Sequence, residues 1–113
     1  MVTAEIAVAL PSLVLVTAIA LWGMAAVSTR ITCTDAARAG ARAAARGESL
    51  QAVRARITEA VPTGAIVKVH RDTEVVRVEV SVPVRGPAAA GLPALQVRAR
   101  VAAATEPGIS LTE

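Results

Sequence analysis

Aromatic residues are almost missing from this 113-residue chain, which has no Phe, no Tyr and a single Trp, Trp22. A core built only from Val, Leu, Ile and Ala lacks the large burial per residue that aromatic side chains provide. The part that follows the apolar N-terminal run, residues 28–113, is also small, and a small domain buries a lower share of its surface. We therefore expect this part to be only marginally stable by itself.

Residues that bind metals or act as nucleophiles are equally scarce. The chain has one Cys, Cys33, and one His, His70, so it has neither a disulfide pair nor a Cys/His zinc ligand set. It has no glycine-rich phosphate loop, and its acid pair, Asp72 with Glu74, lies in an expected turn without pocket-forming neighbours. We expect no enzymatic activity, no cofactor, no metal and no small-molecule substrate, and we interpret His70 as a solvated cross-strand partner.

The positive charge of the chain is not concentrated anywhere. The formal net charge is +3, from 12 basic and 9 acidic residues, and the basic residues are spread along the sequence. Nucleic-acid-binding proteins usually cluster Lys and Arg and add aromatic side chains for stacking. We expect no nucleic-acid partner.

Charge is absent altogether from Ile6–Val27 (IAVALPSLVLVTAIALWGMAAV), a run of 22 residues between Glu5 and Arg30. As a helix it would be about 33 Å long, against a hydrocarbon core of about 30 Å. It is apolar on almost all sides, and the hydroxyls of Ser12 and Thr17 can bond carbonyls one turn back. The run predicts a transmembrane helix, because the rest of the chain is too small to wrap it as a buried core helix.

A cleaved signal peptide, which would release a secreted domain, is an alternative for the same run. Ala18-Ile19-Ala20 fits a small-x-small cleavage pattern, although residues 1–5 lack a basic segment and the run exceeds a signal core of about 7–15 residues. Pro11 lacks the N–H that would bond the carbonyl of Ala7, so we expect a kink or a loosening there. Ser12 and packed neighbours are expected to satisfy the freed carbonyl.

Helical character is expected to continue to Arg46, because residues 28–46 are rich in Ala and contain no Pro, and Gly47 is a natural stop. Arginines at multiples of four form one stripe, and Asp35 can pair with Arg38. The other side is nearly smooth. It either packs closely against another helix or lies in solvent, and both alternatives stay open. The arginines are Arg30, Arg38, Arg42 and Arg46, and the small residues are Ala36, Ala37, Ala39, Gly40, Ala43 and Ala44.

A second, shorter helix is expected from about Leu50 to Val61. Ser49 is a plausible N-cap, and apolar residues recur at helical spacing up to Pro62-Thr63-Gly64. The spacing then changes to two. Strands are expected at 66–71, 75–85 and 95–103, separated by a turn at Asp72-Thr73 and a loop at 86–93. Apolar residues alternate with polar ones along the second strand, which is the antiparallel pattern; Val76, Val78, Val80, Val82 and Val84 share one face.

Pro83 favours an edge strand or the fraying end of a strand. The fold class is therefore α+β: a long N-terminal helix (a transmembrane half plus an extramembrane half), a short second helix and a small three-stranded antiparallel sheet. We divide the chain into a membrane-inserted helix (1–29), an extramembrane helical segment (30–61), the sheet (62–105) and a flexible tail (106–113). Only the helices at 35–46 and 50–61 are available to cover the apolar face of the sheet.

The N-terminal string VTAEIAVALP, residues 2–11, resembles the mature N-terminus of type IV pilin-like proteins. More specifically, it is similar to TadE-type minor pilins of tight-adherence (Flp) pilus systems. The matching residues are Glu5, Ala7, Leu10 and Pro11, and Trp22-Gly23 falls where that family often has an aromatic residue and a glycine. The detailed match covers only about the first 30 residues.

The resemblance implies a structural minor pilin or pseudopilin of a pilus or secretion assembly, held in the lipid bilayer by its N-terminal helix before assembly. Its implied partners are other pilin-like subunits, the pilus assembly machinery and, if an upstream leader exists, prepilin peptidase. Family precursors carry a short basic leader ending in Gly, which these residues do not include. The alternative function is a single-span anchored extracytoplasmic binding protein that never enters a filament.

Glu5 is the implied assembly residue. By similarity with the family, its carboxylate would meet the N-terminal ammonium of a neighbouring subunit, which removes two charges from low dielectric and requires a free amine at position 1. Alternatively, the carboxylate extends into the headgroup region, since a carboxylate at the edge of the hydrocarbon is costly unless paired.

The positive-inside rule compares the basic residues on the two sides of the span. The arginines that follow the span would keep the C-terminal part in the cytoplasm, whereas a basic leader before it would reverse this balance of charge. Following the resemblance, we expect a single-pass protein of the cytoplasmic membrane, with residues 28–113 on the extracytoplasmic side or in the pilus.

Overall fold

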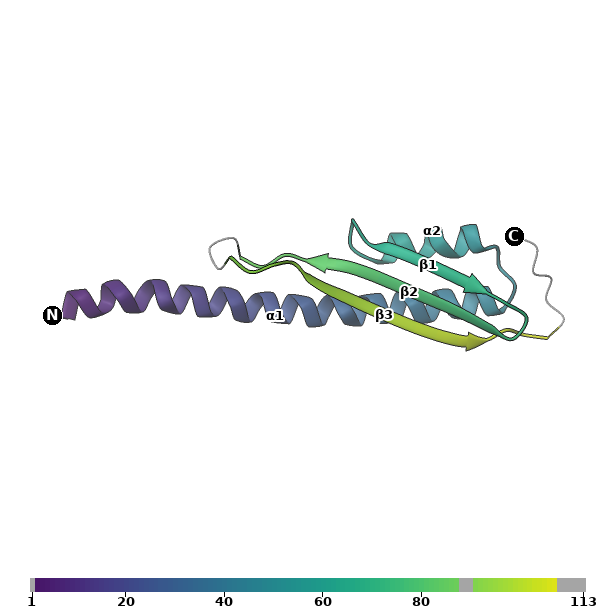
Figure 1. Cartoon of the computed structure of the whole chain (residues 1–113), viewed down its shortest axis with the longest axis horizontal. Coiled ribbons are helices and arrows are strands. Elements are labelled where there is room, and N and C mark those ends of the chain that lie inside the picture. The colour runs from purple at the N-terminus through teal and green to yellow at the C-terminus, as the bar shows by residue number, and fades with distance from the viewer. Residues whose placement is uncertain (1, 88–90, 108–113) are drawn as a thin grey trace.

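One long helix supports a three-stranded sheet and a second helix (Figure 1). The structure, a computed structural model, describes residues 2–87 and 91–107. The elements are α1 (Val2–Ala45), α2 (Leu50–Ala60), β1 (Ile66–Arg71), β2 (Val75–Val84) and β3 (Leu95–Ala104). The sheet and α2 lie along the C-terminal half of α1, and the N-terminal half projects alone, which gives extents of 77 × 19 × 17 Å. The expected α+β class is confirmed.

Helix α1 runs without interruption through Pro11 and past the expected boundary between residues 29 and 30. The Ser12 hydroxyl donates to the carbonyl of Val8 at 2.8 Å, not to the Ala7 carbonyl that Pro11 leaves free. The helix reaches Ala45, one residue short of the expected Arg46. A kink at Pro11 stays a prediction.

The C-terminus of α1 is closed by Gly47, as expected. Gly47 has φ 91°, which only glycine adopts without strain, and its N–H donates to the carbonyl of Ala44 at 3.1 Å. The N–H of Glu48 donates to the carbonyl of Ala43 at 3.2 Å, which completes a Schellman motif. The side chain of Arg71 adds bonds to the carbonyls of Ala44 and Glu48, at 3.1 and 2.8 Å. The sequence did not predict this last contact.

Helix α2 begins where its cap predicts. The hydroxyl of Ser49 accepts a hydrogen bond from the N–H of Ala52 at 3.1 Å. Val53 and Ile57 of α2 face the core and are almost fully buried. Glu48, just before α2, pairs with Arg46 and Arg56 at 3.1 Å each.

The sheet has the order β1-β2-β3, and both pairs are antiparallel. The expectation that Pro83 marks an edge strand is wrong, because β2 is the central strand. Its alternative, a strand end, fits better: pairing with β1 stops at Ser81, opposite Ile66, whereas Pro83 pairs only with Gln96 of β3. The strand therefore has a neighbour on one side only at Pro83, where a missing N–H costs least.

The core is made from small and branched aliphatic side chains, as the composition predicts. The inward valines of β2 pack on the small face of α1 and share one core cluster with the buried side chains of α2; they are Val76, Val78, Val80 and Val82. The small face thus packs inside its own chain, which settles the alternative left open by the sequence. Its expected members are buried except Ala39, which is exposed, while Ala41 and Ala45 are buried although they were not expected there.

Gly40 of α1 lies directly against Ile57 of α2. A Cβ built on Gly40 would lie 2.7 Å from Cγ1 of Ile57, so only a glycine lets α1 and α2 approach this closely. The expected pair of Asp35 with Arg38 is not among the ion pairs of the described residues. Because both side chains are exposed, such a pair would contribute little.

The expected tail begins at Glu106, whose N–H donates to the carbonyl of Ala45 at 3.1 Å. Residues 108–113 of that tail, residues 88–90 of the expected loop, and residue 1 lie outside the described residues.

Candidate membrane anchor and assembly site

Helix α1 exposes large apolar side chains along its projecting half, up to Leu21, and on its uncovered side as far as Val27. Val8, Val14 and Met24 are 68–69% exposed, and the most apolar 18-residue window of α1 is 0% buried. The alternative of a buried core helix is therefore wrong for this chain. The exposed set also includes Ile6, Leu10, Leu13, Leu15, Val16, Ile19, Leu21 and Val27.

A membrane accounts for this exposure. Burying a Val, Leu or Ile side chain is worth about 1.5–3 kcal/mol. Over the exposed set, whose side chains are 38–69% exposed, this gain is comparable with the whole stability of an ordinary domain, about 5–15 kcal/mol, before the cost of transferring the hydrogen-bonded backbone. The one long apolar N-terminal helix thus fits a single-pass membrane anchor.

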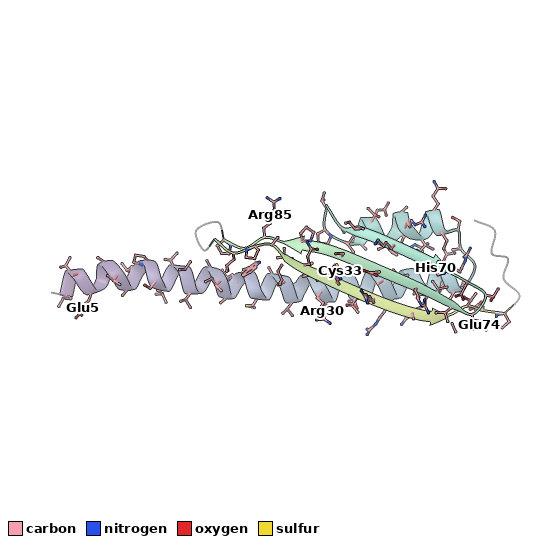
Figure 2. The ribbon with its side chains drawn as sticks, in the orientation of Figure 1. Glu5, Arg30, Cys33, His70, Glu74 and Arg85 are labelled. Atoms are coloured by element: carbon pink, nitrogen blue, oxygen red, sulfur yellow. The ribbon has the colours of Figure 1, made fainter. Side chains whose placement is uncertain are left out.

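Glu5 lies in the first turn of α1, at the end of the molecule farthest from the sheet (Figure 2). The first Lys or Arg that follows it is Arg30, 25 residues and about 37 Å along the same helix. None of the ion pairs between described residues involves Glu5. A carboxylate in a first turn is stabilised by the helix dipole, which is a local role for Glu5 beside the assembly role.

Trp22 connects α1 to the end of β2 next to the projecting half of the helix. Its indole N–H donates to the carbonyl of Val84 at 3.2 Å, and a Cβ on Gly86 would lie 3.2 Å from Cε2 of the indole ring. The sequence singled out Trp22 only through the family resemblance and gave no sign of this contact, since Trp22 and Val84 are 62 residues apart.

Just beyond Trp22, α1 has a shallow apolar groove that the sheet leaves uncovered. Met24, Val27 and Ile31 line it with exposed side chains, and Gly23 has open space where a side chain would be. Its exposed apolar side chains and the space beside Gly23 suit contact with another helix or with lipid chains.

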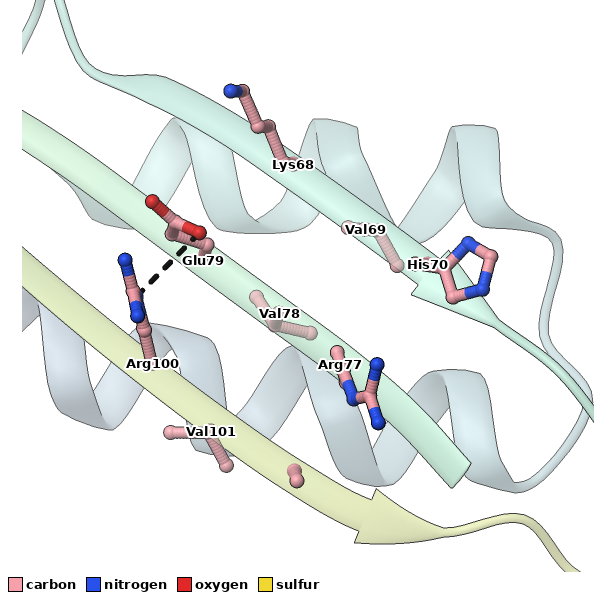
Figure 3. A pocket seen from close by; sticks show the side chains of 9 residues that line it. Lys68, Val69, His70, Arg77, Val78, Glu79, Arg100 and Val101 are labelled. Atoms are coloured by element: carbon pink, nitrogen blue, oxygen red, sulfur yellow. Dashed lines mark ion pairs between the residues drawn. The ribbon is translucent and has the colours of Figure 1, made fainter. Parts of the chain in front are cut away.

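The outward face of the sheet carries a broad charged hollow of about 570 Å³ (Figure 3). Glu79 of β2 and Arg100 of β3 face each other there, with Oε2 and Nε 3.6 Å apart. His70 is exposed opposite Arg77, so the prediction of a solvated cross-strand partner is confirmed. Within the described residues no group of three His, Cys, Asp or Glu side chains is placed to hold a metal ion.

The acid pair at the β1–β2 turn has a structural role. The carboxylate of Asp72 accepts hydrogen bonds from the N–H groups of Val75 (2.6 Å) and Glu74 (2.8 Å). These two bonds, Val75 first, hold the pKa of the Asp72 carboxyl below its ordinary value. The Thr105 hydroxyl donates to the carbonyl of Asp72 at 3.0 Å, which attaches the end of β3 to the same turn.

Cys33 is fully buried between α1 and the sheet and is a free cysteine. It behaves there as a small apolar core residue, and its burial shields it from reagents and from a second thiol.

Comparison with known proteins shows similarity to a mycobacterial protein. The chain is 41% identical over 104 residues to a protein of Mycobacterium tuberculosis (strain ATCC 25618 / H37Rv) named "Apoptosis inhibitor Rv3655c". The match covers 92% of this chain and 78% of the relative. No family model matches the chain, and no solved structure matches it.

Proposed function

The chain belongs to the family of this mycobacterial protein, and we propose that it is a structural minor pilin or pseudopilin of a tight-adherence (Flp) type pilus or secretion assembly. The subunit is held in the cytoplasmic membrane by α1 before it joins the assembly. Its partners are the lipid bilayer, other pilin-like subunits and the assembly machinery, with prepilin peptidase added if a leader precedes the mature N-terminus.

The observation that carries the proposal is the division of α1 into two unlike halves. From Ile6 to Leu21 the helix is bare and apolar, and from Cys33 to Ala45 it holds a compact sheet. A bare apolar helix can exchange lipid contacts for contacts with other helices, because both surroundings are apolar and helix association in lipid depends on close packing. A subunit that moves from a bilayer to a bundle of helices needs this property.

In this proposal the carboxylate of Glu5 forms an ion pair between neighbouring subunits. The described chain places no basic side chain near Glu5, and a carboxylate taken out of the headgroup region needs a cation. The N-terminal ammonium of a neighbouring subunit, one step along the assembly, supplies this cation and sets the stagger between helices. Pro11, one and a half turns further on, lets the helix adapt at the same contact.

Residues 28–113 lie on the extracytoplasmic side in this proposal. The basic side chains of the sheet, among them Lys68, Arg77 and Arg100, would then face the cell exterior. The name of the relative reports an effect on apoptosis and mentions no assembly. It therefore adds no support to the pilin proposal.

The charged outer face of the sheet favours a second candidate, a single-span anchored extracytoplasmic binding protein that stays in the membrane. The two candidates differ in what they require of Glu5. An anchor has no use for this charge, whereas staggered assembly depends on it.

In-cell crosslinking separates the two candidates. A photo-crosslinking residue at Leu13, which is exposed on the projecting half, should capture the N-terminal segment of an adjacent subunit in the otherwise unchanged chain. Glu5→Gln keeps size and polarity, and Glu5→Leu also removes the desolvation cost, so both should stay in the membrane and lose the crosslink.

Glu59→Gln is the matched control, because it removes one exposed carboxylate from α2 and should keep the crosslink. Crosslinks that persist undiminished in Glu5→Leu would contradict the pairing mechanism. They would leave Glu5 as a residue of the headgroup region.

A further inference from the structure

The structure describes both ends of the connection between β2 and β3, residues 85–87 after β2 and residues 91–94 before β3. β2 runs toward the projecting half of α1 and the antiparallel β3 runs away from it, so the end of β2 and the start of β3 lie beside the helix and not at the far end of the sheet (Figure 1). The bond from Trp22 to Val84 and the contact of Gly86 with the indole ring attach the end of β2 there. Trp22 itself belongs to the uncharged run Ile6–Val27.

Helix length decides where the membrane surface meets this connection. From Ile6 to Leu21, the part of the run before Trp22, there are 16 residues and only about 24 Å of helix. A hydrocarbon core of about 30 Å needs more. If α1 spans a bilayer, the hydrocarbon core therefore extends along the helix to Trp22 or beyond it. The chain that lies beside Trp22 is then at the lipid surface.

The composition of the connection suits this position. No residue from Gly86 to Val97 carries a charge. Among its described side chains, Leu92 is 40% exposed and Leu95 is 47% exposed, so each keeps a large apolar area that the described residues leave uncovered. Trp is also the side chain most typical of the membrane–water boundary, where its ring is apolar and its N–H finds a polar partner.

Basic residues flank the connection on the side of the sheet. Arg30 and Arg98 line one shallow groove between α1 and β3 together with Leu95. Arg85 directly precedes Gly86, and Figure 2 shows Arg85 and Arg30 on opposite sides of the molecule. Arginines placed just outside an apolar segment are positioned to bind the phosphates of lipid headgroups.

We propose that the described ends of the β2–β3 connection, residues 85–87 and 91–95, form a second membrane contact, in which Gly86, Pro87, Leu92 and Leu95 dock on a phospholipid surface with acidic headgroups. Arg30, Arg85 and Arg98 bind the phosphates, and Trp22 joins the connection to the span. The contact fixes the depth and tilt of the folded part relative to the bilayer. It rests on α1 being the anchor, and it has to be released when the subunit leaves the membrane.

The test uses the full chain in vesicles of phosphatidylcholine, with and without phosphatidylglycerol. In a Cys33→Ala background, Leu92→Cys carries an environment-sensitive NBD label, and Leu95→Cys is a second reporter. The control is Thr73→Cys, because Thr73 is exposed in the β1–β2 turn at the opposite end of the sheet.

Labels at 92 and 95 should show blue-shifted, stronger emission and quenching by lipids that carry a nitroxide near the headgroup. The label at 73 should show neither effect, and phosphatidylglycerol should strengthen the signal at 92. Labels at 92 and 95 that behave like the label at 73, in a chain that still resists carbonate extraction, would overturn the contact and leave the anchor standing. Release of the chain by carbonate would overturn the anchor and this contact together. Crosslinks that persist in Glu5→Leu would overturn only the pairing of Glu5 and would leave the anchor and this contact standing.

Discussion

The two halves of α1 differ in the size of their apolar side chains, which are large in the projecting half and small in the half that packs against the sheet. The half that projects, up to Leu21, consists largely of Val, Leu and Ile, and these large side chains are exposed. The half that packs, from Cys33 to Ala45, consists of Ala, Gly and Cys at its buried positions. The most apolar surface of the chain is thus not the surface around which it folds.

The size of the side chains in each half of α1 suits what that half contacts. Large aliphatic side chains fill space well against mobile lipid chains, while small ones let a sheet and a second helix come close to the backbone of α1. The packed half compensates for its small side chains with valines from β2 and β3 and with Ile57 from α2. One helix can in this way serve two environments without an interruption.

The largest expected effect comes from a charge in the packed half. Val80 is fully buried on the central strand, so Val80→Asp buries a carboxylate without a partner and should destabilise the folded part by several kcal/mol. The projecting half does not depend on this packing, so the variant should still resist carbonate extraction while its sheet becomes sensitive to protease. Arg77→Ser, on the exposed face of the same strand, should change stability by no more than about 0.5 kcal/mol. Equal losses in thermal melts of the two variants would contradict the register described above.

Two glycines of α1 sharpen the comparison between the halves. Gly40→Ala forces a methyl group against Ile57, whose side chain is held in the core, and should cost about 1–3 kcal/mol in chemical denaturation of the folded part. Gly23→Ala meets nothing within 4 Å in the uncovered part of the helix and should be neutral or slightly stabilising. Ile57→Val should recover part of the loss in Gly40→Ala, since it removes the methyl group that the new side chain meets first. A loss at Gly23 as large as that at Gly40 would mean that the bare half is packed as tightly as the other.

The smallest effect is a pH dependence confined to the β1–β2 turn. Because hydrogen bonds in the folded state lower the pKa of Asp72, its ionised form contributes stability above the unfolded pKa, about 3.9. This contribution is lost as the pH falls through the lower, folded pKa. The stability advantage over Asp72→Asn should therefore be complete at neutral pH and shrink below about pH 4, in melts recorded across that range. Glu59→Gln controls for the loss of one negative charge, and an advantage that does not change with pH would contradict the assigned hydrogen bonds.

The fold could be predicted from the sequence largely because its signals are local. The change of spacing after Pro62, the cap at Ser49 and the stop at Gly47 predicted α2, the strands and the end of α1 to within a residue or two. The inward valines of β2 followed from simple alternation. Each of these signals depends only on neighbours within a few residues.

What escaped prediction depends on contacts between distant residues or on weak contrast. Ala39 and Ala41 differ in burial although they are the same residue type on the same helix, and only the position of the sheet distinguishes them. The bond from Trp22 to Val84 and the contact of Arg71 with the end of α1 join residues that no local pattern connects. The central place of β2, which corrects the edge assignment at Pro83, likewise follows from strand order.

Thiol accessibility along α1 in intact membranes tests the division of the helix most directly. In a Cys33→Ala background, Val14→Cys and Arg42→Cys place single thiols on the two halves, both at positions that the folded chain leaves exposed. A membrane-impermeant maleimide added to membranes that are open on both sides should label Arg42→Cys rapidly. It should label Val14→Cys only after the membrane is dissolved in denaturing detergent. Equal labelling of Val14→Cys and Arg42→Cys in intact membranes would contradict the account, because it would place the bare half of α1 in water.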